Sequence, residues 1–343
     1  MTFAVTGSKP PFFSQILAFQ FSAGLAQQHL IVEDSANNLL YIFKGTGATG
    51  SGGVLTNSFT LVNKIQIPSA DGAGPIYLGD FNGDGNTDLI VNGQTGNSAS
   101  VYLGNGDGTF QLPVRYPFDH NVHSILMHDM NHDGIQDMVV EGDRGVIEIF
   151  PGTGTTANPF STTSIGGTPA GVDGFSGNGG HLAIIDPNTL DIFTTTPIGL
   201  SVLQPQSGTL TYALKAIYNI GPGRSSFALA DFYNSGHLDL AVDSAEGVVI
   251  FRADANNDGG FQTSNAYAAL QPALGSVIGK FRNVGNPNGN LDVVVPTGAV
   301  QAQLLTGNGA GAFTAFPAPA DTSVPFGLPA NLWSNLVSGD FNG

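Results

Sequence analysis

Residues 76–91 read IYLGDFNGDGNTDLIV, and this stretch decides the fold because the chain repeats it. Residues 125–140 read ILMHDMNHDGIQDMVV, and residues 227–242 read FALADFYNSGHLDLAV. Weaker copies of the same pattern stand at 17–32, 172–185 and 277–295, and a last copy begins at 337–343. Self-similarity at spacings of 45 to 60 residues is the signature of a repeat architecture, in which one supersecondary unit recurs with loops of adjustable length.

Every copy has the same internal order. An apolar run such as Ile76 to Leu78 precedes an Asp/Asn/Gly loop, and a second apolar run such as Leu89 to Val91 follows it. A third run ends in glycine, as in VYLG at 101–104, and the turn NGDGTF at 105–110 leads into a fourth. Four short strands joined by tight turns are typical of a propeller blade, and packing blades side by side buries faces that a lone sheet would expose.

The sequence therefore predicts an all-β β-propeller of four-stranded blades, with six complete repeats plus a truncated seventh, of the seven-bladed type. A sandwich or jelly roll is the alternative, but it would not return one loop motif at the same place in each unit. We expect a single domain over 1–343, with repeats at about 12–70, 71–118, 119–168, 169–222, 223–272 and 273–328 and a partial one at 329–343. Because the chain stops inside a loop motif, we expect it to be a fragment of a longer protein.

The N-terminal stretch PFFSQILAFQFSAGLA at 11–26 is similar to the apolar region of a signal peptide. Its only upstream charge is Lys9, however, and two prolines follow that lysine at once. The repeat explains the stretch better, so we predict a strand here.

Composition excludes several classes of function. The formal net charge is −16, with 26 acidic against 10 basic residues, which offers no electrostatic footprint for nucleic acid or anionic membrane. There are no cysteines, so disulfides, thiolate metal sites and cysteine nucleophiles are ruled out. No apolar run reaches the roughly 18 residues that a membrane-spanning helix needs, and membrane insertion is not expected.

Two of the loops carry a complete set of oxygen donors at positions 1, 3, 5 and 9, with glycine at position 6. Hard oxygen donors at alternating positions of a tight turn suit Ca²⁺, which takes six to eight of them, and a backbone carbonyl at position 7 adds one more. The candidate ligands are Asp80, Asn82, Asp84, Asn86 and Asp88 in the first loop, and Asp129, Asn131, Asp133, Ile135 and Asp137 in the second. The alternative is that such loops are simply good turns, with Asx side chains capping backbone groups.

These loops are not EF-hands, because position 12 is Val91 or Val140 where an EF-hand requires a bidentate Glu. The loop with Asp231 and Asp239 is a degenerate third copy of the calcium motif, and we expect its site to be weak or empty. Tyr233 and Ser235 replace two ligands in that loop. In the sixth copy only Asp292 is kept, and Lys280 and Arg282 stand at positions 1 and 3, where a side-chain cation is hypothesised to replace the ion.

The quoted residues 76–91, 125–140 and 101–110 resemble FG-GAP/VCBS repeats, the units of the integrin α-subunit propeller, of certain fungal lectins and of many bacterial surface proteins. The resemblance implies a seven-bladed propeller outside the cytoplasm, in a bacterial surface or secreted member of the family. It also implies a role in adhesion, carbohydrate binding or protein binding. Calcium sites of this type are often weak, at about 10⁻⁴–10⁻³ M, which favours an extracellular or cell-surface setting.

No catalytic constellation emerges from the residues. The recurrent Asp residues are explained by the loops, and no GxSxG motif or phosphate-binding loop is present. Four histidines lie close together in the sequence, at His120, His123, His128 and His132. They suggest a zinc site, although polar residues on the surface of the loop are the better explanation.

The leading hypothesis is a calcium-stabilised extracellular scaffold, not an enzyme, that binds a protein or glycan ligand through blade loops. It would be monomeric or part of a larger multidomain chain. The alternative is a propeller enzyme, or an accessory domain of a polysaccharide-degrading enzyme.

Overall fold

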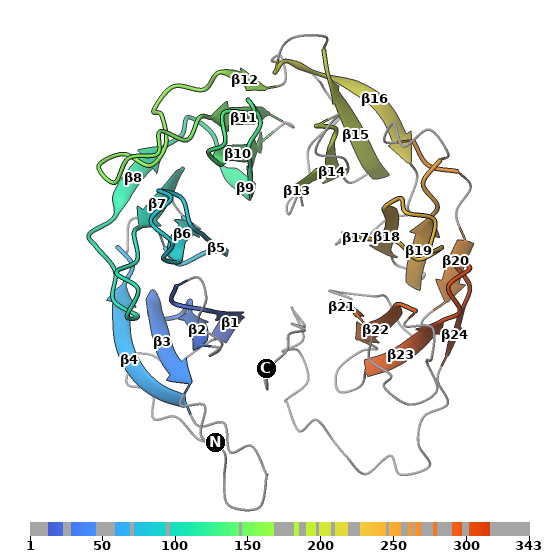
Figure 1. The fold of residues 1–343 in the computed structure, drawn as a ribbon, viewed down its shortest axis with the longest axis horizontal. Helices are drawn as coiled ribbons and strands as arrows, with labels where there is room; N and C mark the ends of the chain where they lie inside the picture. Colours follow the sequence, from blue (N-terminus) through green and yellow to red (C-terminus); the bar gives the residue numbers. More distant parts are fainter. Residues whose placement is uncertain are drawn as a thin grey trace, which may run out of the picture. The chain divides into compact units, whose positions relative to one another are not determined.

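The fold is that of a computed structural model, and it consists of β-strands and turns (Figure 1). The structure describes residues 13–22, 29–45, 59–68, 72–93, 97–143, 146–167, 182–184, 190–196, 199–206, 210–218, 227–244, 247–254, 260–262, 265–268, 277–279, 290–296 and 302–315. None of these residues lies in an α-helix, which confirms the prediction of an all-β chain. The partial seventh repeat, Lys280 and Arg282 lie outside the described residues.

The chain separates into two compact units, and the described residues of the first lie within 1–167. This unit holds three antiparallel sheets of four strands each. The first sheet consists of β1 (Phe13–Phe19), β2 (His29–Asp34), β3 (Leu39–Gly45) and β4 (Phe59–Gln66). The second consists of β5 (Ile76–Gly79), β6 (Asp88–Asn92), β7 (Ser98–Tyr102) and β8 (Val114–Pro117). The third consists of β9 (Val122–His128), β10 (Asp137–Gly142), β11 (Ile147–Phe150) and β12 (Gly166–Gly167).

The second unit, within residues 168–338, also holds three antiparallel four-stranded sheets. The fourth sheet consists of β13 (Leu182–Ile184), β14 (Ile192–Thr196), β15 (Gly199–Pro205) and β16 (Tyr212–Tyr218). The fifth consists of β17 (Phe227–Ala230), β18 (Asp239–Ser244), β19 (Gly247–Phe251) and β20 (Asn265–Ala268). The sixth consists of β21 (Val277–Gly279), β22 (Asp292–Pro296), β23 (Ala302–Gly307) and β24 (Phe313–Ala315).

In all six sheets the strand order in space is the order along the chain, so each sheet is built from four consecutive strands. The strand predicted near the N-terminus is present as β1, which pairs with β2.

The core lies between neighbouring sheets, and this arrangement explains the unbroken apolar runs. In β6, all five residues are buried. Leu89 and Val91 pack in a cluster with the first sheet, whereas Ile90 packs in a cluster with the third. Because successive side chains of a strand point to opposite faces, a sheet covered on both sides needs apolar residues at consecutive positions.

The fifth sheet shows the same arrangement in the second unit. Leu240 and Val242 of β18 join a cluster with the fourth sheet, while Ala241 between them joins a cluster with the sixth. The loop that precedes each such strand is therefore fixed at one end by a fully packed element.

Candidate functional site

The loop between β5 and β6 curls around the carboxylate of Asp80. Its Oδ1 accepts a hydrogen bond from the Gly83 amide at 2.8 Å, and its Oδ2 accepts one from the Gly85 amide at 2.9 Å. Both glycines have positive φ, at 75° and 83°, a conformation that glycine adopts without steric cost. Asp84 Oδ1 accepts a hydrogen bond from the backbone amide of Asn86 at 2.8 Å. Asp84 Oδ2 accepts one from the side-chain Nδ2 of Asn82 at 3.1 Å. The side chains at positions 1, 3 and 5 thus gather on one loop.

The loop between β9 and β10 repeats this geometry. Asp129 Oδ2 accepts from the Gly134 amide at 2.8 Å, and Asp129 Oδ1 accepts from the Asp133 amide at 3.1 Å. Asp133 Oδ1 accepts a hydrogen bond from the backbone amide of Ile135 at 2.8 Å. Asp133 Oδ2 accepts one from the side-chain Nδ2 of Asn131 at 3.0 Å. Two loops far apart in sequence therefore present the same set of oxygen donors, which suits a hard cation such as Ca²⁺.

The ninth-position aspartates have a role that the sequence analysis missed. Asp88 is fully buried, and its two oxygens accept hydrogen bonds from the backbone amides of Phe81 and Gly104, both at 2.8 Å. Asp137 does the same with the amides of Met130 and Gly152, again at 2.8 Å. Each carboxylate therefore ties the start of its loop to the turn after the next strand pair. Each oxygen of Asp88 accepts one of these bonds and keeps a second lone pair, so its bridge is compatible with metal ligation.

The same bridge recurs where some or all of the other loop acids are missing. Asp239 accepts from the amides of Phe232 at 2.8 Å and Ala253 at 2.9 Å. Asp292 Oδ1 accepts from the Gly307 amide at 3.1 Å. In the first sheet His29 takes this place, and its Nδ1 accepts from the Gly45 amide at 3.2 Å. The persistence of Asp292 in the sixth copy was the signal in the sequence that this position is structural.

Burial makes the charge on these bridging carboxylates costly. It raises the pKa of Asp88 to about 6, against two backbone hydrogen bonds that lower it, and the nearby charges of Asp84 and Asp80 raise it further. Burial likewise raises the pKa of Asp137 and of Asp239. A divalent cation in the loop would offset this concentration of negative charge.

The fourth position of the loop offers a test of backbone strain. His132 has a positive φ of 60°, whereas the first loop has Gly83 at 75° in the same place. We expect His132→Gly to raise the free energy of unfolding by about 0.5–1 kcal/mol, because a positive φ is sterically unfavourable for a residue with a Cβ but not for glycine. Urea denaturation measures the change. The reciprocal substitution Gly83→His is the control and should destabilise; a gain in stability there would contradict the argument.

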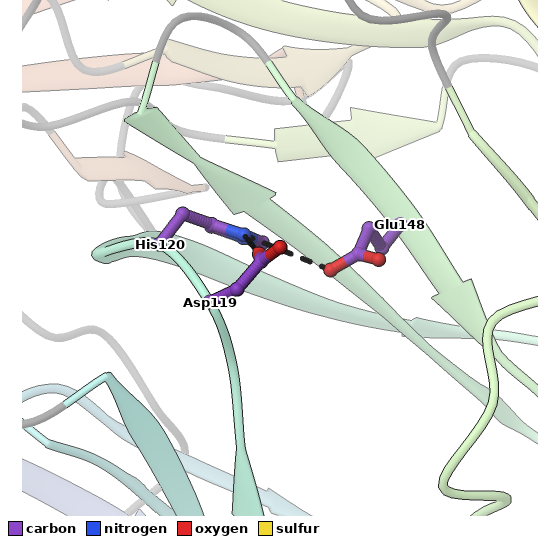
Figure 2. A group of neighbouring side chains, drawn as sticks. All are labelled: Asp119, His120 and Glu148. Atoms are coloured by element: carbon purple, nitrogen blue, oxygen red, sulfur yellow. Dashed lines mark hydrogen bonds and ion pairs between the residues drawn. The ribbon is translucent and has the colours of Figure 1, made fainter.

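The histidines that the sequence groups together do not converge on one point. His120 Nδ1 lies 2.8 Å from Asp119 Oδ1 and 3.8 Å from Glu148 Oε2. Figure 2 shows the three side chains pointing toward one another, with Glu148 reaching in from β11. His123 instead contacts Asp143, with 2.8 Å between Nε2 and Oδ1.

The trio of Asp119, His120 and Glu148 has ligand atoms within 4.8 Å of one another. One imidazole and two carboxylates form a donor set that suits a divalent transition metal. The Asp119 side chain is 97% exposed, however, and in the structure the imidazole bonds to this carboxylate directly. Glu148 is distant from His120 in sequence, so only the pairing of β11 into the sheet reveals the group.

Comparison with known proteins supports the repeat and the fold. Residues 80–140, which span both candidate loops, match the model of an FG-GAP-like repeat. No curated protein matches the chain. Among the described residues, no helix is long and apolar enough to cross a membrane.

Several solved structures of β-propeller type are similar to this chain. A lectin from Agrocybe aegerita, described as recognising non-reducing terminal N-acetylglucosamine, is 15% identical with a TM-score of 0.57, over 88% of this chain and 80% of the lectin. A protein from Lactobacillus plantarum is 13% identical with a TM-score of 0.56, over 89% of this chain and 95% of that one. A functionally unknown protein from Desulfotomaculum acetoxidans is 12% identical with a TM-score of 0.52, over 83% and 78% of the two chains.

Proposed function

We propose that this chain, which carries an FG-GAP-like repeat at residues 80–140, is a calcium-stabilised binding scaffold of the β-propeller type. In this proposal the propeller is seven-bladed and acts outside the cell or at its surface. It recognises a protein or glycan ligand through the loops that join the strands, and it is monomeric or part of a larger multidomain chain.

The observation that carries the proposal is the identical geometry of the two loops. In each, a first-position carboxylate is wrapped by backbone amides, oxygen donors stand at the third and fifth positions, and a buried carboxylate of raised pKa follows at the ninth. One such loop is explained as a turn. Two loops in the same register, both with buried negative charge, favour binding of the same kind of cation in each. The proposed ligands are the ten residues at positions 1, 3, 5, 7 and 9 of the two loops.

The hydrogen bonds of the buried aspartates favour a binding function over a catalytic one. Raised pKa values often mark catalytic groups. Here, however, Asp88, Asp137 and Asp239 each have both oxygens occupied by backbone amides, which explains their burial without a reaction. The similarity to the Agrocybe aegerita lectin favours a glycan among the possible partners.

A glycan array probed in calcium and in EDTA, together with a hydrolase and lyase screen on common polysaccharides, tests this function. Capture of a defined glycan class that weakens in EDTA, with no turnover, is the expected result. Turnover of any polysaccharide by the pure protein would contradict the proposed scaffold and show that the protein is an enzyme.

A further inference from the structure

The second compact unit contains a pocket of about 300 Å³ in its fifth sheet. The residues lining it come from the loop between β17 and β18, from the turn after β19 and from the chain beyond it. They are Ser235, His237, Arg252, Ala253, Asp254 and Gln262.

The pocket exists where one glycine of the repeat has become alanine. In three other sheets the residue that bonds the bridging aspartate is glycine, and an added Cβ would lie 2.1 to 2.3 Å from a carbonyl oxygen of the preceding loop. Those glycines are Gly104, Gly152 and Gly307, and the oxygens belong to Thr87, Gln136 and Leu291. Ala253 holds the same place, because its amide donates to Asp239 at 2.9 Å. The same close approach would clash with its methyl group, and Ala253 lines the pocket together with Ser235 and His237 of the preceding loop.

The loop on this side of the pocket has kept its shape but lost the cation ligands at positions 3 and 5. Asp231 still accepts hydrogen bonds from the amides of Ser235 and Gly236, both at 2.8 Å. Tyr233 and Ser235 occupy the third and fifth positions, where the first two loops have Asn and Asp. A neutral hydroxyl therefore faces the pocket in place of a carboxylate.

The polar groups of the pocket include two hydrogen-bond donors suited to an anion. The Arg252 guanidinium lies 4.8 Å from the centroid of the Tyr233 ring, a cation–π contact that restrains it. Nδ1 of His237 is sealed from solvent and has no hydrogen-bond partner among the described residues. A bare acceptor is tolerated in such a place better than an orphan N–H, so the hydrogen of the neutral ring belongs on Nε2.

We propose that this pocket binds an acidic sugar unit of the hexuronate type. Its carboxylate pairs with Arg252, whose planar fork matches two oxygens, and with His237 Nε2–H. The sugar hydroxyls bond to Ser235, Asp254 and Gln262, which supply both acceptors and donors. A volume of about 300 Å³ is at the lower end for ligand pockets and suits a single sugar unit. The inference rests on the proposed function and names the ligand class of one of its binding loops.

Titration calorimetry with D-glucuronate and D-glucose tests the proposal, because the two sugars differ only at C6; D-galacturonate and D-galactose form a second pair. We expect the acid to bind at least about tenfold more tightly than the neutral sugar. Arg252→Gln should weaken glucuronate binding by about tenfold or more, whereas Arg115→Gln, the same change on an exposed strand residue of the first unit, should leave it unchanged.

A second variant tests the origin of the pocket. Ala253→Gly removes the methyl group and lets the loop approach as it does at Gly104, so glucuronate binding should be lost while the melting temperature is kept or raised. Equal affinity for glucose and glucuronate, no binding of either acid at millimolar concentration, or full binding by Arg252→Gln would each overturn the proposal.

These experiments distinguish a failure of the pocket proposal from a failure of the proposed scaffold function. Glucuronate binding that survives Arg252→Gln would overturn the pocket, and calcium-dependent capture of another glycan on the array would leave the scaffold intact. A melting temperature indifferent to calcium would contradict the calcium loops and leave the pocket standing, because this loop lacks the Asn at position 3 and the Asp at position 5.

Discussion

Removal of calcium is expected to lower the melting temperature of this protein by about 6–12 °C near neutral pH. A ligand at tenfold above its dissociation constant contributes about 1.4 kcal/mol per site, so two sites contribute about 3 kcal/mol. Each kcal/mol moves the melting temperature of a unit of this size by about 2–4 °C. Calorimetric melts in millimolar calcium, in magnesium and in EDTA measure the effect, and an unchanged melt after full chelation would contradict it.

The calcium effect should shrink in acid, and Asp88 sets the pH range. Its pKa in the folded protein is about 6, above the ordinary value of 3.8. The folded state therefore takes up a proton that the unfolded state releases, and the stability this gives is complete below about pH 4 and is lost as the pH rises through about 6. Protons then compete with calcium at the loop. The same calcium addition should raise the melting temperature less at about pH 5 than at about pH 7.5, and an equal rise at both would contradict this linkage.

An isosteric variant controls for loop folding. Asp84→Asn combined with Asp133→Asn keeps an oxygen for the amides of Asn86 and Ile135 but removes two negative charges from the loops. This double variant should fold in EDTA and show little response to calcium. A full response in the variant would place the ion elsewhere.

Truncation of a bridging aspartate should be the most destabilising single change in the loops. Asp137→Ala leaves the buried amides of Met130 and Gly152 without acceptors, and each such loss costs about 1–3 kcal/mol. We expect a loss of about 2–6 kcal/mol, present in EDTA as well as in calcium. Urea denaturation under both conditions measures it.

The matched control is Asp107→Ala. This carboxylate is exposed and accepts hydrogen bonds from the backbone amide and the hydroxyl of Thr109 in its own turn, so its loss should cost less than about 1 kcal/mol. If Asp137→Ala were costly in calcium and harmless in EDTA, the aspartate would be a metal ligand without a structural role.

The apolar runs and the Asp/Asn/Gly loops predicted the strands well, because both are local signals. The run from Leu89 to Val91 reads as a strand covered on both faces, and β6 is one. The bridge from Asp88 to Gly104 escaped prediction, since it joins a side chain to a backbone amide that only folding brings near. Ala253 escaped for a related reason: the cost of a Cβ depends on a carbonyl oxygen from another loop.

The order of the strands has a consequence for how such a chain can change in length. Every strand in the six sheets pairs only with strands adjacent to it along the chain, so each sheet forms through contacts that are local in sequence, at small entropic cost. Duplication or deletion of one whole repeat then breaks no ladder of backbone hydrogen bonds inside the sheets that remain. The ladders inside the sheets therefore set no fixed number of units, and whatever limits that number acts through the contacts between neighbouring sheets.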